Sequence, residues 1–260
     1  RRERERTRGL SSTDRPTPVR IARDAREEPE RERAPGPPPL RLRLLLLVSR
    51  TGRRVPAHDV VRHRVVVRLA AKDDAHVIIV QERKLWSEGA EVASAELLKN
   101  GLMSWWCPAI PGPNEGASSG AAIIVRRGLG FRPLADLGGD CKGRVTAGVV
   151  ELPGQEEMLV VSLYLKDGVG ISGVNERVLA EVGAQLSSTL LPTLIGGDFN
   201  VDPSQIEDSD FPARLKARLL APEEAAHYQA GANAAAAPSA LDFFIASSGL
   251  ARGAKKLEVS

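Results

Sequence analysis

Residues 193–200 read Thr-Leu-Ile-Gly-Gly-Asp-Phe-Asn, an apolar run that ends in two glycines, an acid and an amide. The apolar part predicts a short buried strand over residues 193–197. Asp198 and Asn200 follow two residues apart, and the two-residue period of a strand would put both on one face. Taken alone, the motif is equally typical of an Asx turn that ends a strand.

Three other polar residues stand in comparable places. Glu82 follows the apolar run of residues 77–80, Tyr164 ends the run of residues 159–163, and Asp242 lies within residues 241–245. An unpaired carboxylate in an apolar strand is costly to bury, so we expect Asp242 to meet a histidine or a cation. Four polar groups at four strands favour one shared site over coincidence.

Around these motifs, apolar runs alternate with helical patterns and turn-forming loops. Strands are predicted over residues 40–48, 76–80, 103–107, 121–126, 144–152, 158–164, 193–197 and 241–246, with one more beginning at residue 255. Helices are predicted over residues 55–71, 88–99, 173–188 and 211–220, with Ser87 and Ser172 as N-caps of the second and third. Loops are predicted over residues 110–120 and 230–240, and a hairpin turn at Pro153-Gly154. This mixture of hairpins and crossover helices predicts a layered α/β architecture.

The N-terminal part differs in composition from the rest of the chain. Residues 1–39 are rich in Arg, Glu and Pro, which predicts a disordered basic tail before a domain over residues 40–260. Residues 1–70 hold 19 Lys+Arg against 9 Asp+Glu, and the remainder holds 17 against 24. The acidic remainder does not favour a strong duplex-binding face, but it suits a site where carboxylates surround a cation.

Neither a membrane span nor a disulfide framework is expected. The apolar run of residues 44–48 is far shorter than the ~18 residues of a spanning helix. Cys107 and Cys141 are two cysteines in 260 residues, and no His/Cys spacing supports a zinc site, so we expect small buried thiols. A reduced compartment, the nucleus or the cytoplasm, is the corresponding expectation.

Taken in order, the motifs resemble those of the endonuclease/exonuclease/phosphatase superfamily. The resemblance is carried by Gln81-Glu82, Tyr164, Gly197-Asp198-Phe199-Asn200 and Leu241-Asp242-Phe243-Phe244. It is strongest to the branch of apurinic-site endonucleases and non-LTR retrotransposon endonucleases. The resemblance implies a four-layer α/β sandwich, with two mixed, mainly antiparallel sheets packed face to face and helices outside. Gly143-Arg144-Val145 also fits the pattern, although Arg144 itself ranks low as a site residue.

The resemblance also implies a role for each motif. Glu82 would bind Mg²⁺, or Mn²⁺ in its place, because Mg²⁺ takes one or two carboxylates and completes its shell with water and substrate phosphate. Asp198 would orient or deprotonate the attacking water, and Asn200 would donate a hydrogen bond to the phosphate. Tyr164 would contact the phosphate or assist the leaving group, and Asp242 would hold a catalytic histidine.

The implied activity is Mg²⁺-dependent phosphodiester hydrolysis of the endonuclease type, by a monomer that acts on nucleic acid without a stable protein partner. Two departures leave an alternative open. Residues 44–49 lack the family's first-strand Asn, and no Asp-His pair follows Asp242. The chain is expected to be incomplete at its C-terminus, or to be a degenerate member that binds without catalysis. Phospholipids, inositol phosphates and RNA tails are alternative substrates, because a fold does not choose among them.

Overall fold

The computed structural model describes residues 44–48, 70, 75–82, 84–112, 116–154, 156–221 and 241–253. Several predicted segments lie outside these residues: the tail over residues 1–39, nearly all of the helix over residues 55–71, the loop over residues 230–240 and the strand beginning at residue 255.

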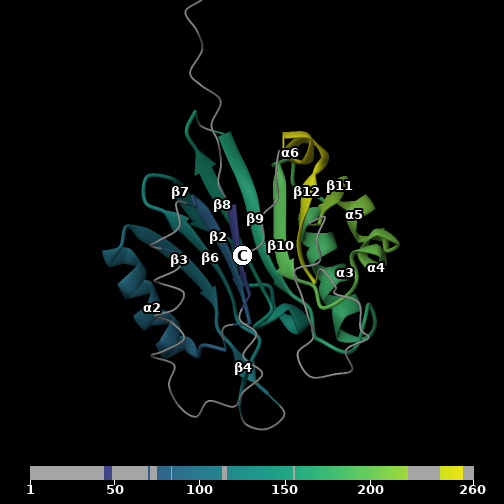
Figure 1. Cartoon of the computed structure of the whole chain (residues 1–260), viewed down its shortest axis with the longest axis horizontal. Helices are drawn as coiled ribbons and strands as arrows, with labels where there is room; N and C mark the ends of the chain where they lie inside the picture. Colours follow the sequence, from purple (N-terminus) through teal and green to yellow (C-terminus); the bar gives the residue numbers. More distant parts are fainter. Residues whose placement is uncertain are drawn as a thin grey trace, which may run out of the picture. The chain divides into compact units, whose positions relative to one another are not determined.

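Two β-sheets form the body of the fold (Figure 1). The first has the order β1-β2-β6-β3, with strands Leu44–Val48, Val77–Gln81, Ala121–Arg126 and Leu102–Cys107. The second has the order β11-β12-β10-β9-β8-β7, with strands Ala217–Leu220, Asp242–Ser247, Thr193–Asp198, Glu156–Tyr164, Val145–Leu152 and Gly130–Pro133. Among the described strands, β1–β2 and β9–β10 pair in parallel and the other neighbours pair antiparallel.

Short elements connect and flank these sheets. Within the described ranges, the chain forms the helices α2 (Ser87–Lys99), α3 (Val174–Leu186), α4 (Pro203–Glu207), α5 (Asp210–Arg214) and α6 (Ser248–Gly253), and Gly139–Cys141 forms a 3-10 turn. Strands β4 (Ile110–Pro111) and β5 (Ala117–Ser118) form a small separate hairpin.

Three hydrophobic clusters separate four layers. Because alternate residues of a strand face opposite sides, each sheet contributes to two clusters. The two sheets share a cluster that includes Val77, Ile79, Ile123, Val160, Leu194 and Phe244. The outer face of the second sheet packs on α3 and α5 through Val178 and Phe211, and the outer face of the first packs on Leu97 of α2. This arrangement of helix, sheet, sheet and helix confirms the predicted four-layer sandwich.

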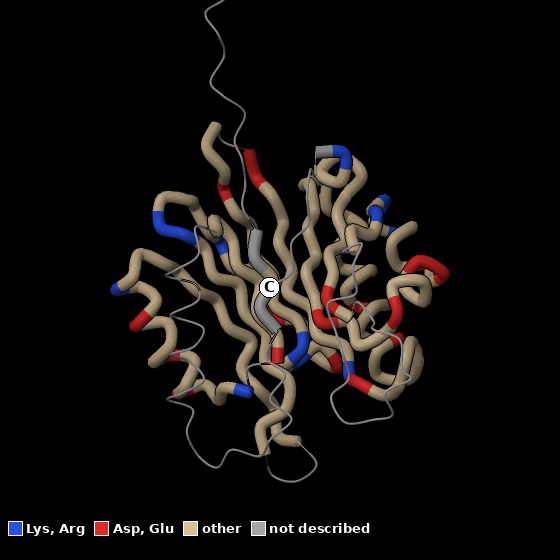
Figure 2. Tube along the Cα trace, viewed as in Figure 1, with Lys and Arg blue, Asp and Glu red and all other residues tan. Residues whose placement is uncertain are grey.

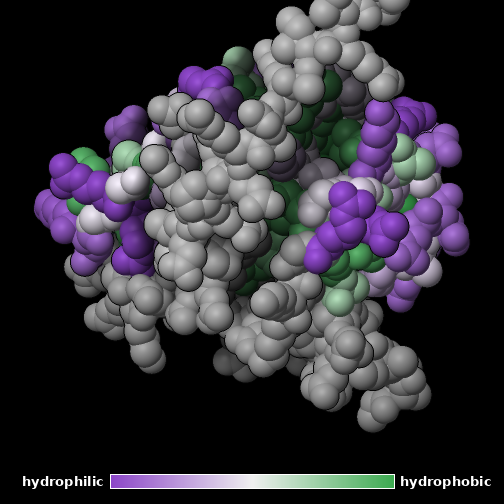
Figure 3. All heavy atoms as spheres, turned by 90° about the horizontal axis from the view of Figure 1, so that it is seen from above, coloured by the Kyte–Doolittle hydropathy of each residue, from purple (hydrophilic) through white to green (hydrophobic). Residues whose placement is uncertain are grey.

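The sandwich buries its apolar residues between its layers. In Figure 3 hydrophobic residues show in the middle of the molecule, with hydrophilic residues on the two flanks. Gly196 contributes to the tight contact between the sheets. A Cβ atom at Gly196 would lie 2.8 Å from the Cδ1 of Ile79 on the facing sheet and 2.9 Å from the Cε1 of Phe244 on β12, so a larger residue there would require these side chains to shift.

Some local predictions were wrong. The helix predicted over residues 211–220 is the short α5 followed by strand β11, because Lys216 turns the chain at a φ of 50° and β11 then pairs with β12. Ser87 is the first residue of α2 rather than its N-cap. The N-cap of α3 is Gly173, while the hydroxyl of Ser172 donates instead to the Val169 carbonyl oxygen. Strand pairing therefore outweighed the helix signal at residues 217–220.

Candidate functional site

Three of the predicted site residues lie side by side in one row across the second sheet. Tyr164 is the parallel register partner of Asp198, and Asp198 is the antiparallel register partner of Asp242. The row lies where β9 and β10 end and β12 begins, and these strands run side by side in Figure 1. Val160 and Leu194 face the first sheet, so the two-residue period turns Tyr164 and Asp198 toward the same side.

Glu82 approaches this row from the facing sheet. It directly follows β2, and its charge acts on Tyr164 together with the charge of Asp198. Its Oε1 lies 3.0 Å from the Nζ of Lys84. Glu82 and Lys84 have φ angles of 53° and 52°, a sparsely populated region for side-chain-bearing residues. Such conformations persist only where the surrounding structure holds them, and they cluster at functional sites.

Acidic and basic residues lie close together at this end of the sandwich. Figure 2 shows red and blue segments close together near the lower ends of the strands. Burial of Tyr164 raises the pKa of its phenol well above the ordinary value, and the negative charges of Glu82 and Asp198 raise it further, against a smaller opposite effect of Arg144. Tyr164 is therefore a neutral hydrogen-bond donor throughout the physiological pH range.

Arg144 joins the row beside Tyr164, although its sequence pattern ranked it low. The Tyr164 amide donates to the Arg144 carbonyl oxygen at 2.9 Å, and the Arg144 guanidinium carbon lies 5.7 Å from the centroid of the Tyr164 ring. Only 8% of Arg144 is exposed, and its Nη1 has no hydrogen-bond partner within the described residues. A buried guanidinium with a spare donor is suited to bind a phosphate.

Asn200 reaches the site in a way that differs from the prediction. Strand β10 ends at Asp198, and Asn200 adopts a left-handed φ of 50°, so the strand period does not place it. Asn tolerates this conformation better than most residues. Its Nδ2 donates to the Leu165 carbonyl oxygen at 2.9 Å. An amide nitrogen has two protons, so one remains for a ligand.

The oxygen ligands here suit a hard divalent cation. Glu82 and Asp198 both act on the same phenol, and one or two carboxylates are what Mg²⁺ takes from a protein. Within the part of the chain that the structure describes, no three His, Cys, Asp or Glu side chains gather as a metal cage. Of the four histidines, the structure describes His76, which directly precedes β2, so a histidine partner for Asp242 remains a prediction.

Trp106, Cys107 and Cys141 have packing roles. Trp106 packs against the cluster under α2, and its Nε1 donates to the Ser104 hydroxyl at 2.9 Å. Cys107 and Cys141 are buried free thiols, as predicted.

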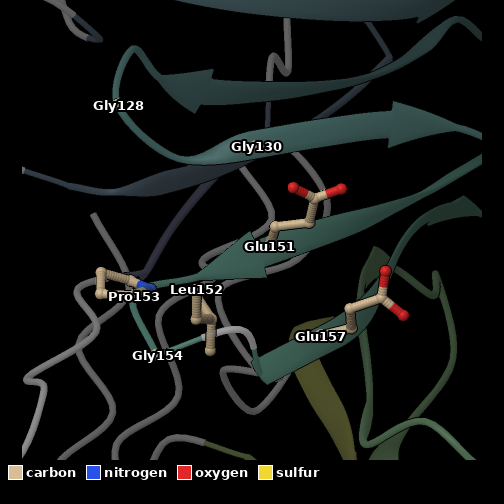
Figure 4. Close-up of a pocket in the computed structure, with 7 residues that line it drawn as sticks. All are labelled: Gly128, Gly130, Glu151, Leu152, Pro153, Gly154 and Glu157. Atoms are coloured by element: carbon tan, nitrogen blue, oxygen red, sulfur yellow. The ribbon is translucent and has the colours of Figure 1, made fainter.

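A separate cavity lies at the far end of the β8–β9 hairpin (Figure 4). It has a volume of about 430 Å³ and is lined by Gly128, Gly130, Glu151, Leu152, Pro153, Gly154 and Glu157. Glu157 lies seven residues before Tyr164 on β9, which is roughly 23 Å along a strand. Its carboxylate is already paired with Arg132 at 3.1 Å. This cavity is therefore distinct from the row of site residues.

Comparisons with known proteins agree with the fold. The model of the Endonuclease/Exonuclease/phosphatase family matches residues 50–258. The structure is similar to TDP2 of D. rerio in complex with a single-strand DNA product, at a TM-score of 0.55 and 13% identity, covering 79% of this chain and 83% of that one. No curated protein matches the chain.

Two endonuclease structures share the same architecture. The endonuclease domain of TRAS1, a telomere-specific non-LTR retrotransposon, has a TM-score of 0.50 at 13% identity, over 82% of this chain and 88% of that one. AP endonuclease LMAP from Leishmania major has a TM-score of 0.51 at 15% identity, over 74% and 75%. At these identities the likeness concerns the fold.

None of the helices described here is long and apolar enough to cross a membrane.

Proposed function

This chain belongs to the Endonuclease/Exonuclease/phosphatase family, and on that premise we propose that it hydrolyses phosphodiester bonds in nucleic acid as a Mg²⁺-dependent endonuclease. The observation that carries the proposal is the row formed by Tyr164, Asp198 and Asp242, with Glu82 acting on it from the facing sheet. Hydrolysis of a phosphodiester requires a base for water, donors for the phosphate and charge neutralisation. These residues offer a base and a donor, and Glu82 would bind the cation that neutralises the charge.

Asp198 is the residue best placed to orient and deprotonate the attacking water. It is 1% exposed, so its carboxylate acts in a medium of low dielectric constant, where an acceptor binds a water proton more strongly than in bulk solvent. A carboxylate in this role contributes about 10²–10⁴-fold to the rate.

Three donors are available for the phosphate. Tyr164 keeps its proton because burial raises its pKa, Asn200 retains one amide proton, and Arg144 retains its Nη1. Donors fixed in advance stabilise the charge that develops on the phosphate oxygens without reorganising during the reaction. Glu82 would hold Mg²⁺, and the bound ion would neutralise charge on the phosphate and lower the pKa of a coordinated water.

The relatives support nucleic acid as the substrate. The similar structures with TM-scores of at least 0.50 include two endonucleases and one complex with a single-strand DNA product. The test is a panel of supercoiled plasmid, abasic-site duplex, single-strand RNA with a poly(A) tail and a soluble inositol phosphate, each with Mg²⁺. Preferential cleavage of either DNA supports the proposal. Turnover of the inositol phosphate alone would contradict it, and binding of DNA without cleavage would identify a non-catalytic relative.

A further inference from the structure

Gln81 introduces polar contacts into an otherwise apolar interface between the two sheets. It is the last residue of β2 and is fully buried. Its Nε2 donates to the Ser162 hydroxyl at 3.1 Å and to the Gly196 carbonyl oxygen at 3.2 Å. The Ser162 hydroxyl donates in turn to the Val80 carbonyl oxygen at 2.9 Å. Three hydrogen bonds thus join the end of β2 to both β9 and β10.

These bonds lie directly beneath the candidate site. Ser162 and Gly196 are register partners, and each precedes a site residue by two positions on its strand, namely Tyr164 and Asp198. Residues two apart on a strand share a face, so the Gln81 contacts occupy the next row of side chains. On its other side, Gln81 is covalently joined to Glu82. The bonds therefore fix the segment that carries one carboxylate to the strands that carry the other groups.

Stability does not explain a glutamine here. The Gln81 Oε1 has no hydrogen-bond partner within the described residues. A buried polar side chain that is only partly satisfied is less favourable than an apolar side chain of the same shape. Methionine has a similar length and flexibility and fills irregular core gaps well. A residue that stability alone would not select is evidence for a role in the neighbouring site.

We propose that Gln81 is a positioning residue for Glu82, an inference that rests on the proposed function. Its two donated bonds hold the end of β2 against β9 and β10, and so hold the Glu82 carboxylate in place relative to Asp198 and Tyr164. Metal sites are sensitive to such support, and loss of an outer hydrogen-bonding partner typically lowers metal affinity or activity 10–100-fold.

The test is a titration of the 260-residue chain with Mn²⁺. The electron paramagnetic resonance signal of free Mn²⁺ measures how much of the ion is bound. Gln81→Met removes both hydrogen bonds that Gln81 donates. Ser162→Ala is a smaller change that removes one acceptor of Gln81 and the hydrogen bond to the Val80 carbonyl oxygen. Each is expected to weaken Mn²⁺ binding about tenfold or more while the melting temperature stays within a few degrees of the wild type. Thr146→Val is the matched control. Thr146 is buried opposite Ser162, and its hydroxyl has no hydrogen-bond partner in the described part of the chain.

Glu82→Gln separates this inference from the proposed function. If Glu82→Gln weakens Mn²⁺ binding while Gln81→Met and Ser162→Ala bind as the wild type does, the positioning role is overturned and the metal assignment survives. If the wild type binds no Mn²⁺, or Glu82→Gln binds it equally well, the metal assignment fails and the positioning role fails with it. A loss in Thr146→Val equal to that in Gln81→Met would also overturn the inference, because any change in the polar row would then have the same effect.

Discussion

Tyr164 and Asp198 are register partners on the parallel strands β9 and β10, and the negative charge of the carboxylate helps to keep the phenol protonated. The pair joins a neutral donor to a charged acceptor at one end of the sandwich. A phosphodiesterase needs both functions at neighbouring positions, one for the phosphate and one for the water.

Tyr164→Phe removes a hydrogen-bond donor and leaves the ring packing intact. We expect kcat to fall about 10²-fold, the lower end of the range for one preorganised donor. Because the pKa of Tyr164 is raised, the wild-type rate is expected to show no loss from phenol ionisation up to pH 10. Rates measured from pH 6 to 10 check this. A wild-type alkaline limb that is absent from Tyr164→Phe would contradict the assignment.

Protonated Tyr164 also links stability to pH. The folded-state pKa of Tyr164 lies above its unfolded-state pKa. The protonated phenol therefore contributes fully to the free energy of unfolding below the unfolded-state pKa of ~10. This contribution is lost as pH rises through the folded-state pKa. Wild type is therefore expected to lose stability above pH 10 more steeply than Tyr164→Phe. Urea unfolding at pH 8 and at pH 11 measures the difference, and equal losses in both proteins would count against a raised pKa.

Arg144→Met replaces the guanidinium that lies over Tyr164 with an apolar side chain. We expect KM for DNA to rise about tenfold, because a charged donor to the phosphate is lost. Arg144→Lys is expected to show nearly the same rise in KM, because an ammonium group lacks the planar, forked geometry of a guanidinium. Arg132→Met is the matched control, because Arg132 is exposed and paired with Glu157 at the far end of the hairpin. Equal effects of the Arg144 and Arg132 changes would show a general charge effect instead.

Asp202 provides a prediction about stability alone. It is the N-cap of α4, and its Oδ1 accepts from the Ser204 amide at 2.9 Å and from the Ser204 hydroxyl at 2.7 Å, contacts that lower its pKa. Asp202→Ala is expected to lower the free energy of unfolding by about 1 kcal/mol. The loss should be present above the unfolded-state pKa and fade as pH falls through the lowered folded-state pKa. Urea unfolding at pH 7 and pH 3 measures the difference in the free energy of unfolding. DNA cleavage by Asp202→Ala is expected to equal that of the wild type.

The two thiols report on the interior of the fold. Burial raises the pKa of both Cys107 and Cys141, and the thiolate is the reactive form. Both are expected to resist a thiol-specific reagent at pH 8 in the native protein and to react fully in denaturant. Fast reaction of Cys141 without denaturant would contradict the packing of the second sheet around it, and fast reaction of Cys107 would contradict its burial at the end of β3.

Local patterns predicted much of the fold because its strands are apolar and bounded by turn-forming residues. Residues 193–200 predicted β10 and its polar end, and Pro153-Gly154 marked the β8–β9 turn. The short strand β11 was missed because four residues carry too little periodicity, and its pairing with β12 decided the outcome. Isolated sequence windows contain no such long-range pairing information.

The candidate site also combines features that local sequence predicts with features that depend on long-range pairing. Tyr164, Asp198 and Asp242 could be selected because each stands at an apolar strand, but their common row depends on the registers of β9, β10 and β12. The sequence pattern gave Arg144 a low rank for a related reason. Its burial follows from pairing with Tyr164, twenty residues further along the chain. Nothing in residues 143–145 distinguishes a buried guanidinium from a solvated one.

The most direct test compares Asp198→Ala with Asp202→Ala for Mg²⁺-dependent nicking of supercoiled plasmid and cleavage of an abasic-site duplex. Both changes remove one carboxylate, four residues apart, but Asp198 is buried in the row and Asp202 is an exposed helix cap. We predict that wild type and Asp202→Ala cleave with Mg²⁺ and stop with EDTA, while Asp198→Ala is slower by 10²-fold or more. Equal cleavage by folded Asp198→Ala, or no Mg²⁺-dependent cleavage by the wild type, would contradict the proposed activity.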